Sequence, residues 1–284
     1  MKKVFLLLLT LALFMLLNAQ PLNIMTFNIR YNNPGDSMNA WPYRKDKAAA
    51  QILFHQAHIV GVQEALHDQM MDLQEQLKQY KYVGVGRDDG KQKGEYSAIF
   101  YDTARLQLLQ TETFWLSEQP NVPGSKSWDA AITRIVTWAR YRDKKTRKVF
   151  YAFNTHFDHL GKIARRESAK LLLQKIQAIA GNNPTIVTGD FNAIPSDEPI
   201  QVLTDNTNAF HLINTISISQ QPHYGPTGTF NGFMRNELTN EPIDHIFVTN
   251  MTKGVKVLQH ATLSESWQGR FSSDHFPVIA SILL

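Results

Sequence analysis

Short apolar segments, separated by polar turns, follow one another along most of the chain and predict many strands. Their alternation of apolar and polar residues, and their enrichment in Val, Ile and aromatic residues, are typical of half-buried or fully buried strands. The predicted strands cover residues 22–29, 58–64, 80–86, 96–102, 105–116, 134–143, 148–157, 185–192, 242–250, 255–263 and 276–284.

Three other segments, residues 43–57, 67–80 and 166–180, are predicted to be helices. In two of them apolar residues recur at helical spacing, which indicates an amphipathic helix. These residues are Met70, Leu73, Leu77 and Tyr80 in the first case and Ala169, Leu172, Leu173, Ile176 and Ile179 in the second. The uninterrupted run of strands in the middle of the chain should be antiparallel. We therefore predict an α+β fold, a four-layer α/β sandwich of two packed, mostly antiparallel sheets flanked by helices.

The first twenty residues have the pattern of a secretory signal peptide. A basic start, MKK, precedes an apolar run at residues 4–17 and a short polar segment, NAQ. The run is shorter than the roughly 20 residues that a membrane-spanning helix needs. We expect cleavage near Ala19 or Gln20 and a secreted or periplasmic mature protein; an uncleaved anchor is the alternative.

Composition narrows the choice of chemistry. The 284 residues include no Cys, so a thiolate nucleophile and Cys metal ligands are excluded, and any metal must be bound by oxygen or imidazole. The formal net charge is +4, and removal of Lys2 and Lys3 with the signal peptide leaves 27 − 25 = +2. This balance is not that of a protein that binds many phosphates non-specifically. Because no linker interrupts the chain, we expect one domain.

Acids, amides and histidines recur where the predicted strands end. A single such residue is more often part of a turn or a helix cap, but six strand ends of this kind are hard to explain in that way. Because side chains alternate between the faces of a strand, Asp190 and Asn192 should share a face, as should Asn154 and His156. The six ends carry Asn28, Glu64, His156, Asp190 with Asn192, Asp244, and Asp274 with His275.

This set of side chains suits metal-assisted hydrolysis of a phosphoester. Mg²⁺ and Mn²⁺ prefer hard oxygen ligands and retain several waters, so a few carboxylates and an amide suffice. A His paired with an Asp can act as an acid, a base or a phosphate ligand. The segment GKQKG at residues 90–94 lacks the Ser or Thr and the spacing of a phosphate-binding loop.

The order of the motifs resembles the endonuclease/exonuclease/phosphatase (DNase I-like) superfamily. The segments that carry the resemblance are TFNIR, VGVQE, NTHFDH, TGDFNAIPSD, IDHIFV and SDHFPV. That superfamily includes DNase I-like nucleases, abasic-site endonucleases, neutral sphingomyelinases and inositol-polyphosphate phosphatases. The resemblance begins at about Leu22 and continues to the C-terminus, so the predicted domain covers residues 21–284.

The resemblance implies a cofactor, Mg²⁺ or Mn²⁺, and a set of residues to bind it. Glu64 is implied as a metal ligand, Asn28 as a ligand or phosphate contact beside it, and Asp274 as a direct or indirect metal carboxylate. Asp274 and His275 are adjacent and would face opposite ways in a regular strand. Both can reach one site only if the segment SSDH is a loop or a distorted strand.

The resemblance also implies the catalytic residues. Asp190 would orient or deprotonate the attacking water, and Asn192 would bind the phosphate. Asp244 would orient His275, which would contact the scissile phosphate or the nucleophile. His156 would donate to the phosphate or act as a general acid.

Several other residues are weaker candidates. Trp41 and Arg44 follow the Asn28 strand and either line the site or pack in a loop. Arg134 either reaches phosphate or is an exposed strand residue, and Asp158 and His159 are interpreted as loop residues. The Gly-rich segment 222–233 could overhang the site. The remaining histidines show no metal spacing and are interpreted as structural: His55, His58, His67, His211, His223, His245 and His260.

We therefore expect a secreted, monomeric phosphoesterase that depends on a divalent metal, with a nuclease or other phosphodiesterase as the leading class. The alternatives are a sphingomyelinase-like enzyme, a sugar- or inositol-phosphate phosphoesterase, and a binding module without catalysis. The expected partner is accordingly a phosphoester in a nucleic acid, a phospholipid headgroup or a sugar phosphate, with no stable membrane span. A lipid enzyme should expose an aromatic hairpin, for which residues 111–120 are the candidate.

Overall fold

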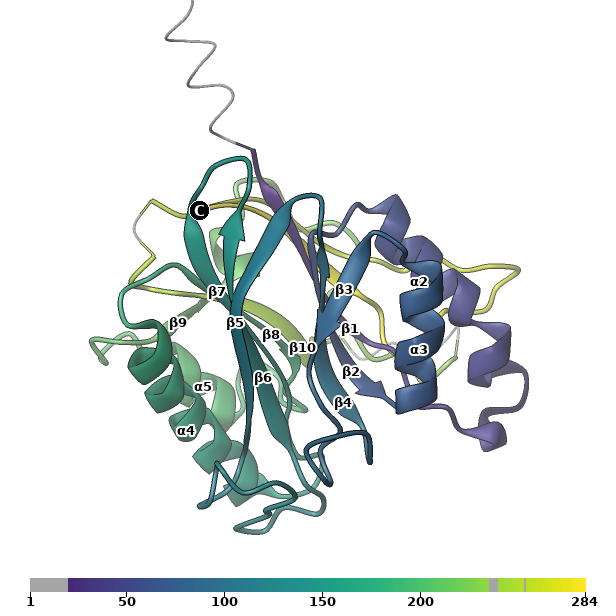
Figure 1. Ribbon diagram of the computed structural model, residues 1–284, viewed down its shortest axis with the longest axis horizontal. Coiled ribbons are helices and arrows are strands. Elements are labelled where there is room, and N and C mark those ends of the chain that lie inside the picture. Colours follow the sequence, from purple (N-terminus) through teal and green to yellow (C-terminus); the bar gives the residue numbers. More distant parts are fainter. Residues whose placement is uncertain (1–19, 235–239, 253) are drawn as a thin grey trace, which may run out of the picture.

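Two six-stranded sheets pack face to face in the computed structural model, and helices cover their outer faces (Figure 1). The structure describes residues 20–234, 240–252 and 254–284. The predicted signal peptide therefore lies almost entirely outside the described residues. Within the described ranges, no helix has the length and apolar character needed to cross a membrane.

The strands of the two sheets come from the whole length of the chain. The first sheet has the order β11 (Lys256–Thr262), β12 (Val278–Leu283), β1 (Leu22–Asn28), β2 (Ile59–Ala65), β4 (Tyr96–Asp102) and β3 (Tyr80–Val83). The second sheet has the order β5 (Leu106–Trp115), β6 (Ile135–Asp143), β7 (Val149–His156), β8 (Thr185–Asp190), β10 (Asp244–Thr249) and β9 (Leu212–Asn214).

Most neighbouring strands in both sheets run antiparallel. The parallel pairs are β1 with β2 and β7 with β8, and each of these pairs is connected by a helix, as a parallel crossover requires. The fold predicted from the sequence, two packed and mostly antiparallel sheets flanked by helices, is therefore confirmed.

Helices α2 (Lys45–Phe54) and α3 (His67–Gln76) cover the first sheet, whereas α4 (Lys162–Ala180) and α5 (Glu198–Thr204) cover the second. The apolar stripe of α4 includes Ala169, Leu172 and Ile176, which are buried against the second sheet. The short helix α5 and three 3₁₀ helices were not predicted: η1 (Pro34–Asn39), η2 (Trp41–Tyr43) and η3 (Thr215–Ile218).

Some predicted boundaries were wrong for local reasons. Helix α3 ends at Gln76, before the predicted end at Tyr80. Tyr80 instead begins β3, and its hydroxyl donates to the carbonyl of Ala57 at 2.8 Å. The predicted strand 80–86 stops at Val83 because Gly84 has a φ of +130°, which breaks the extended backbone.

The interface between the sheets changes from apolar to polar toward one end. Its apolar part includes Ile24, Ile59, Tyr141, Phe150 and Ile186. Toward the polar end, buried side chains hydrogen-bond across the two sheets, and these bonds fix how the strand ends face each other. Gln63 Nε2 donates to Asn154 Oδ1 at 2.7 Å, while Asn154 Nδ2 donates to the carbonyls of Val62 and Ala98, each at 2.9 Å.

The sheets approach closely beneath this polar network, at Gly61 in β2. A Cβ at this position would lie 2.2 Å from Thr188 Oγ1 and 2.4 Å from Asn154 Oδ1. Only glycine therefore allows the two sheets to come together here.

We predict that Gly61→Ala lowers the free energy of unfolding by about 1–3 kcal/mol, the usual cost of an added methyl group in a packed interior. Urea denaturation would measure it. Gly181→Ala is the control, because Gly181 has no atom within 4 Å of the added Cβ and a φ of +56°, so it adds backbone strain without a clash. The close approach of the sheets is not required if Gly61→Ala is as stable as the wild type.

Candidate active site

Polar side chains from both sheets meet in a pocket of about 530 Å³ at the polar end of the interface. Six of the eight site residues predicted from the sequence line this pocket, and the other two, Asn28 and Asp244, are buried and hydrogen-bonded to lining residues. The lining six are Glu64, His156, Asp190, Asn192, Asp274 and His275. Residues far apart in the sequence thus form one site.

A buried histidine and aspartate form a hydrogen-bonded pair behind the pocket. His275 Nδ1 lies 2.8 Å from Asp244 Oδ2. Burial by itself would lower the pKa of His275, but the charge and hydrogen bond of Asp244, with help from Asp190 and Asp274, hold that pKa well above its ordinary value. His275 is therefore an imidazolium whose Nε2–H is available on the pocket side.

Asp190 lies beside this pair because of how the strands align. It is opposite Asp244 in the β8–β10 pairing and opposite His156 in the β7–β8 pairing. Its Oδ2 is 3.4 Å from His156 Nε2 and 3.8 Å from His275 Nε2. Burial, together with the charge of Asp244, raises the pKa of Asp190 to about 7. The group is thus balanced between its acid and carboxylate forms near neutral pH.

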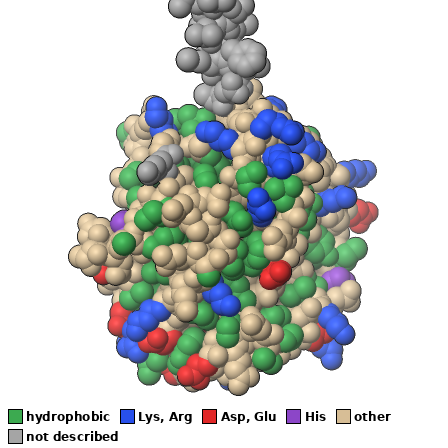
Figure 2. Space-filling view, turned by 60° about the vertical axis from the view of Figure 1, so that its left-hand side comes forward, with side chains coloured by type: hydrophobic (Ala, Val, Ile, Leu, Met, Phe, Trp, Pro, Cys, Tyr) green, Lys and Arg blue, Asp and Glu red, His purple; other side chains and the backbone are tan. Residues whose placement is uncertain are grey.

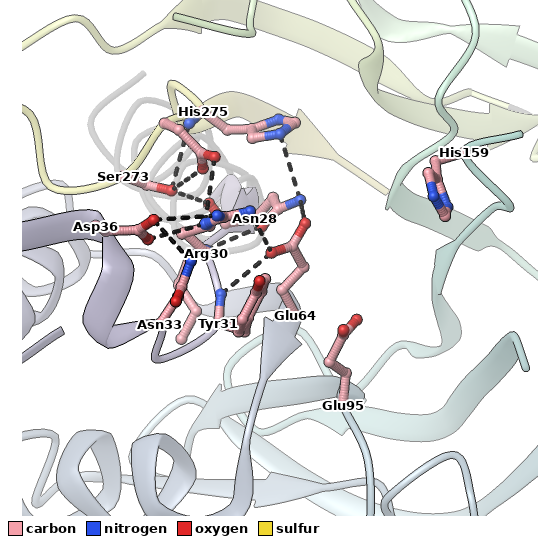
Figure 3. Close-up of polar contacts among 12 residues, drawn as sticks. Asn28, Arg30, Tyr31, Asn33, Asp36, Glu64, Glu95, His159, Ser273 and His275 are labelled. Carbon is pink, nitrogen blue, oxygen red and sulfur yellow. Dashed lines mark hydrogen bonds and ion pairs between the residues drawn. The ribbon is translucent and has the colours of Figure 1, made fainter. Parts of the chain in front are cut away.

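The amide of Asn28 connects the carboxylates of the two sheets (Figure 3). Its Nδ2 donates to Glu64 Oε1 at 3.1 Å and to Asp190 Oδ2 at 2.9 Å, and it lies 3.4 Å from His275 Nε2. Its Oδ1 accepts from the backbone N–H of Arg30 at 3.0 Å. In this arrangement Asn28 presents its nitrogen to the two carboxylates and its oxygen to the backbone.

Glu64 reaches the pocket through an irregularity in β2. The pairing of β2 with β4 shifts between Val62 and Ala65, and Glu64 has a φ of +63°, which is uncommon outside glycine. Such a bulge re-aims a side chain. Here it turns the carboxylate toward the amide of Asn28 and the backbone N–H of Tyr31, which donates to Oε2 at 3.1 Å.

A second carboxylate, Asp274, lies on the same side of the pocket as Glu64. Both are near Arg30, whose Nη1 is 3.9 Å from Glu64 Oε2 and whose Nε is 3.7 Å from Asp274 Oδ2. Asp274 and His275 both reach the site because they precede β12, in a segment outside the regular strands. Burial, reinforced by the charge of Glu64, raises the pKa of Asp274 despite the opposing effects of His275 and Arg30.

Glu64 and Asp274 fit a hard divalent cation. They offer carboxylate oxygens at the open pocket, and the negative charge of Glu64 already disfavours ionisation of Asp274. A cation between such like charges would relieve this repulsion. Oxygen donors with room for water are what Mg²⁺ and Mn²⁺ require.

A second donor group, Asp190, Asp244 and His275, also has atoms within 4.8 Å of one another. Asp244 Oδ1 has no hydrogen-bond partner among the described residues, so one carboxylate oxygen remains free there. A metal bound by this group would, however, need a neutral His275, whereas Asp244 favours the charged ring. The hydrogen-bonded pair is therefore the better description of this group.

His156 and Asn192 are the remaining two residues of the predicted set, and they lie next to each other. Asn192 Nδ2 lies 3.0 Å from His156 Nε2 and donates to the carbonyl of Phe157 at 3.0 Å. Burial, followed by the charges of Arg134 and Arg87, keeps the pKa of His156 well below its ordinary value. His156 is thus neutral, unlike His275.

The weaker candidates have mostly structural surroundings. Trp41 is buried, and its Nε1 donates to Asp72. Arg44 is also buried; it donates to the carbonyls of Ile29, Arg30 and Ser272 and so holds together the loops that carry the site. Asp158 accepts four backbone N–H groups, from Ala131, Ile132, Leu160 and Gly161.

Arg134, His159 and Phe230 do line the pocket. Phe230 belongs to the segment 222–233, and its ring is 5.1 Å from that of His275, so this segment reaches the site. None of the seven histidines interpreted as structural lines the pocket. In the segment 111–120, Phe114 and Trp115 are buried, so they offer no exposed aromatic hairpin for a lipid surface.

Two charged residues that line the pocket, Arg30 and Glu95, were not predicted from the sequence. Arg30 was within the quoted motif TFNIR, and its spacing of two from Asn28 was an available signal. It has a φ of +56° and donates to Asp36 through Nε and Nη2 at 3.0 and 3.1 Å. Glu95, directly before β4, carried no such signal, because a single Glu before a strand is ordinary.

A two-sheet sandwich with acids, amides and histidines gathered at its strand ends defines an α/β-sandwich hydrolase. The chain belongs to the Endonuclease/Exonuclease/phosphatase family, whose sequence profile matches residues 25–275. It is accordingly a phosphoric ester hydrolase, and enzymes of this family use divalent metals.

Several solved bacterial structures are similar over nearly the whole chain. An endonuclease/exonuclease/phosphatase from Bacteroides vulgatus is 42% identical, with a TM-score of 0.87, and the match covers 93% of this chain and 99% of that one. A mannosyl-6-phosphatase of Bacteroides thetaiotaomicron VPI-5482 is 37% identical, with a TM-score of 0.86, and the match covers 93% of this chain and 100% of that one.

Curated relatives are more distant. Nocturnin of Drosophila melanogaster is 24% identical over 241 residues, which are 78% of this chain and 36% of that protein. Protein angel of the same organism is 26% identical over 176 residues, which are 58% of this chain and 47% of that protein. The chain thus spans less than half the length of these two relatives.

The raised pKa of Asp190 predicts how its replacement changes stability without metal. The folded-state pKa is about 7 against an ordinary 3.8, so the folded protein loses stability as pH rises between these values. We predict that Asp190→Asn gains more stability relative to the wild type at about pH 8 than at about pH 5. Thermal unfolding in excess chelator would measure both differences. An equal or smaller gain at the higher pH would show that the carboxylate is not strained.

Proposed function

We propose that this chain is a divalent-cation-dependent phosphatase that releases phosphate from phosphorylated sugars. The observation that carries the proposal is the pocket. Its volume of about 530 Å³ suits one small ligand, and its walls combine the catalytic set with further polar side chains. The likeness to a mannosyl-6-phosphatase over the whole of that chain supports the same substrate class.

The distribution of charge supports a small substrate as well. The sequence has 29 Lys and Arg against 25 Asp and Glu, which is a weak bias for a protein that tracks a polyanion. On the face of the described chain in Figure 2, several Lys and Arg side chains lie in the upper part, whereas the lower part mixes basic and acidic side chains.

In the proposed mechanism Glu64 and Asp274 would hold Mg²⁺ or Mn²⁺. When bound, the cation would neutralise phosphoryl charge. Asp190 as carboxylate accepts the proton of a water molecule that attacks phosphorus in line. The bond from phosphorus to the sugar oxygen breaks, and its electron pair goes to that oxygen, which takes up a proton from solvent while Asp190 returns its own proton to solvent. The near-neutral pKa of Asp190 suits this transfer.

The other side chains are arranged to stabilise the transferred group. The imidazolium of His275, held by Asp244, donates from Nε2 to a phosphoryl oxygen as negative charge develops there. The N–H groups of Asn28 Nδ2 are taken up by Glu64 and Asp190, so Asn28 positions these two carboxylates. Neutral His156 lies at the edge of the pocket beside Asn192 and Asp190 and adds no charge there.

A second candidate function is hydrolysis of phosphodiesters in RNA. It is favoured by the more distant relatives, among them a protein of Mycosarcoma maydis named as the 3'-5'-exoribonuclease subunit Ccr4 of the CCR4-Not complex. That relative is 20% identical over 61% of this chain. Fold and catalytic chemistry would be the same, and only the groups beyond the scissile phosphate would differ.

We also propose that the protein is exported. The basic start and the apolar run at residues 4–17 support this, and the absence of Cys is compatible with an oxidising compartment. N-terminal sequencing of the protein recovered outside the cytoplasm would test the proposal. A mature chain that retains Met1 and remains in the cytoplasm would contradict it.

A substrate panel tests the sugar-phosphate proposal directly. We expect kcat/KM to be higher for mannose 6-phosphate than for bis(p-nitrophenyl) phosphate, single-stranded RNA or sphingomyelin, with stoichiometric release of inorganic phosphate. If RNA is shortened efficiently while mannose 6-phosphate is untouched, the exoribonuclease candidate replaces the phosphatase.

Loss of one carboxylate ligand should weaken binding of the cation. We predict that Glu64→Gln lowers Mn²⁺ affinity by more than the roughly 10- to 100-fold that loss of an outer partner costs. Titration calorimetry would measure it. Glu112→Gln, the same change at an exposed position in β5, is the control. Unchanged affinity in Glu64→Gln would exclude Glu64 as a ligand.

The His275–Asp244 pair should behave as a unit. We predict that His275→Ala lowers kcat by roughly two to four orders of magnitude, as for a positioned acid–base group, and that Asp244→Asn costs less. The double variant should be little worse than His275→Ala, because effects within one unit are not additive. Losses that multiply fully would show that Asp244 acts independently of His275.

A further inference from the structure

The pocket lining includes polar groups that the mechanism leaves without a role. Glu95 lies directly before β4, Arg134 directly before β6, and His159 in the loop after β7. Figure 3 shows Glu95 and His159 outside the hydrogen-bonded network around Asn28, with Glu95 below Glu64 and His159 to the right. These residues are therefore available to the part of a substrate that extends beyond the phosphate.

Arg134 is a buried cation with unused donors. Its side chain is 4% exposed, and its Nη2 lies 3.3 Å from His159 Nδ1. Its Nε and Nη1 have no hydrogen-bond partner among the described residues. Nε does lie 3.8 Å from Asp158 Oδ2, but this ion pair is too long to be a hydrogen bond, and buried donors without acceptors are costly. A ligand oxygen entering the pocket would supply the missing acceptor.

Glu95 lines the same pocket but offers hydrogen-bond acceptors, whereas Arg134 offers donors. Arg87 donates to both of its oxygens, at 2.5 and 3.0 Å, which fixes the carboxylate in place. The charge of this carboxylate is balanced by Arg87, so what it offers a ligand is hydrogen-bond acceptance. It is suited to a part of the substrate that offers hydrogen-bond donors.

We propose that Glu95 and Arg134 form a subsite that binds the hydroxyl groups of a sugar leaving group. A hydroxyl both donates and accepts, so one or two neighbouring hydroxyls can donate to Glu95 and accept from Arg134. A flat aryl leaving group makes neither bond. This inference rests on the proposed sugar-phosphatase function and specifies that the site recognises the hydroxyl groups of the sugar.

The test compares two phosphomonoesters that share the phosphate and differ in the leaving group. We expect Glu95→Gln to lower kcat/KM for mannose 6-phosphate about 10- to 100-fold more than for p-nitrophenyl phosphate, the range for a hydrogen bond to a charged group. Glu112→Gln should leave the ratio of the two values as in the wild type. Equal losses on both substrates would overturn the subsite and assign Glu95 a structural role.

Deoxy analogues make the assignment specific without further change to the protein. Among 2-, 3- and 4-deoxymannose 6-phosphate, at least one should be a poorer substrate for the wild type than mannose 6-phosphate. On that analogue, Glu95→Gln should lower kcat/KM little further. If Glu95→Gln lowers kcat/KM by the same factor on every analogue, Glu95 binds no hydroxyl of the sugar and the proposal fails. Wild-type inactivity on all sugar phosphates, with activity on RNA, would instead remove the proposed function on which the subsite rests.

Discussion

The amide nitrogen of Asn28 is the contact on which the site depends, because it links carboxylates that belong to different sheets. It bonds Glu64 of the first sheet and Asp190 of the second, and it lies 3.4 Å from His275. The backbone N–H of Arg30 fixes the other end of the amide. Without this donor, two buried or half-buried carboxylates would face each other with no neutral group between them.

The strands around this contact place the acidic residues in different surroundings and so give them different roles. On the second sheet, His156, Asp190 and Asp244 are cross-strand neighbours, so burial and like charge raise the pKa of Asp190 to about 7. Asp244 is itself held by the ring of His275. On the other side of the pocket, Glu64 and Asp274 remain near the opening with Arg30 as a partial counter-charge. The site therefore separates a proton-handling group from a cation-binding group.

Much of this arrangement follows from the sequence, because strand alternation is a short-range rule. It placed Asp190 and His156 at strand ends, and both side chains lie in the pocket. It could not foresee the bulge that turns Glu64 inward, which depends on pairing with β4. Nor could it identify Glu95 and Arg134 as two parts of one wall, because loop residues are brought together only by the packing of the two sheets.

The most direct test is anomalous diffraction from crystals soaked with Mn²⁺ and inorganic phosphate. The separation of the two groups predicts a manganese peak bound by Glu64 and Asp274, with phosphate between it and His275, and an intact hydrogen bond from His275 to Asp244. A manganese peak among Asp190, Asp244 and His275, with that hydrogen bond broken, would contradict the account.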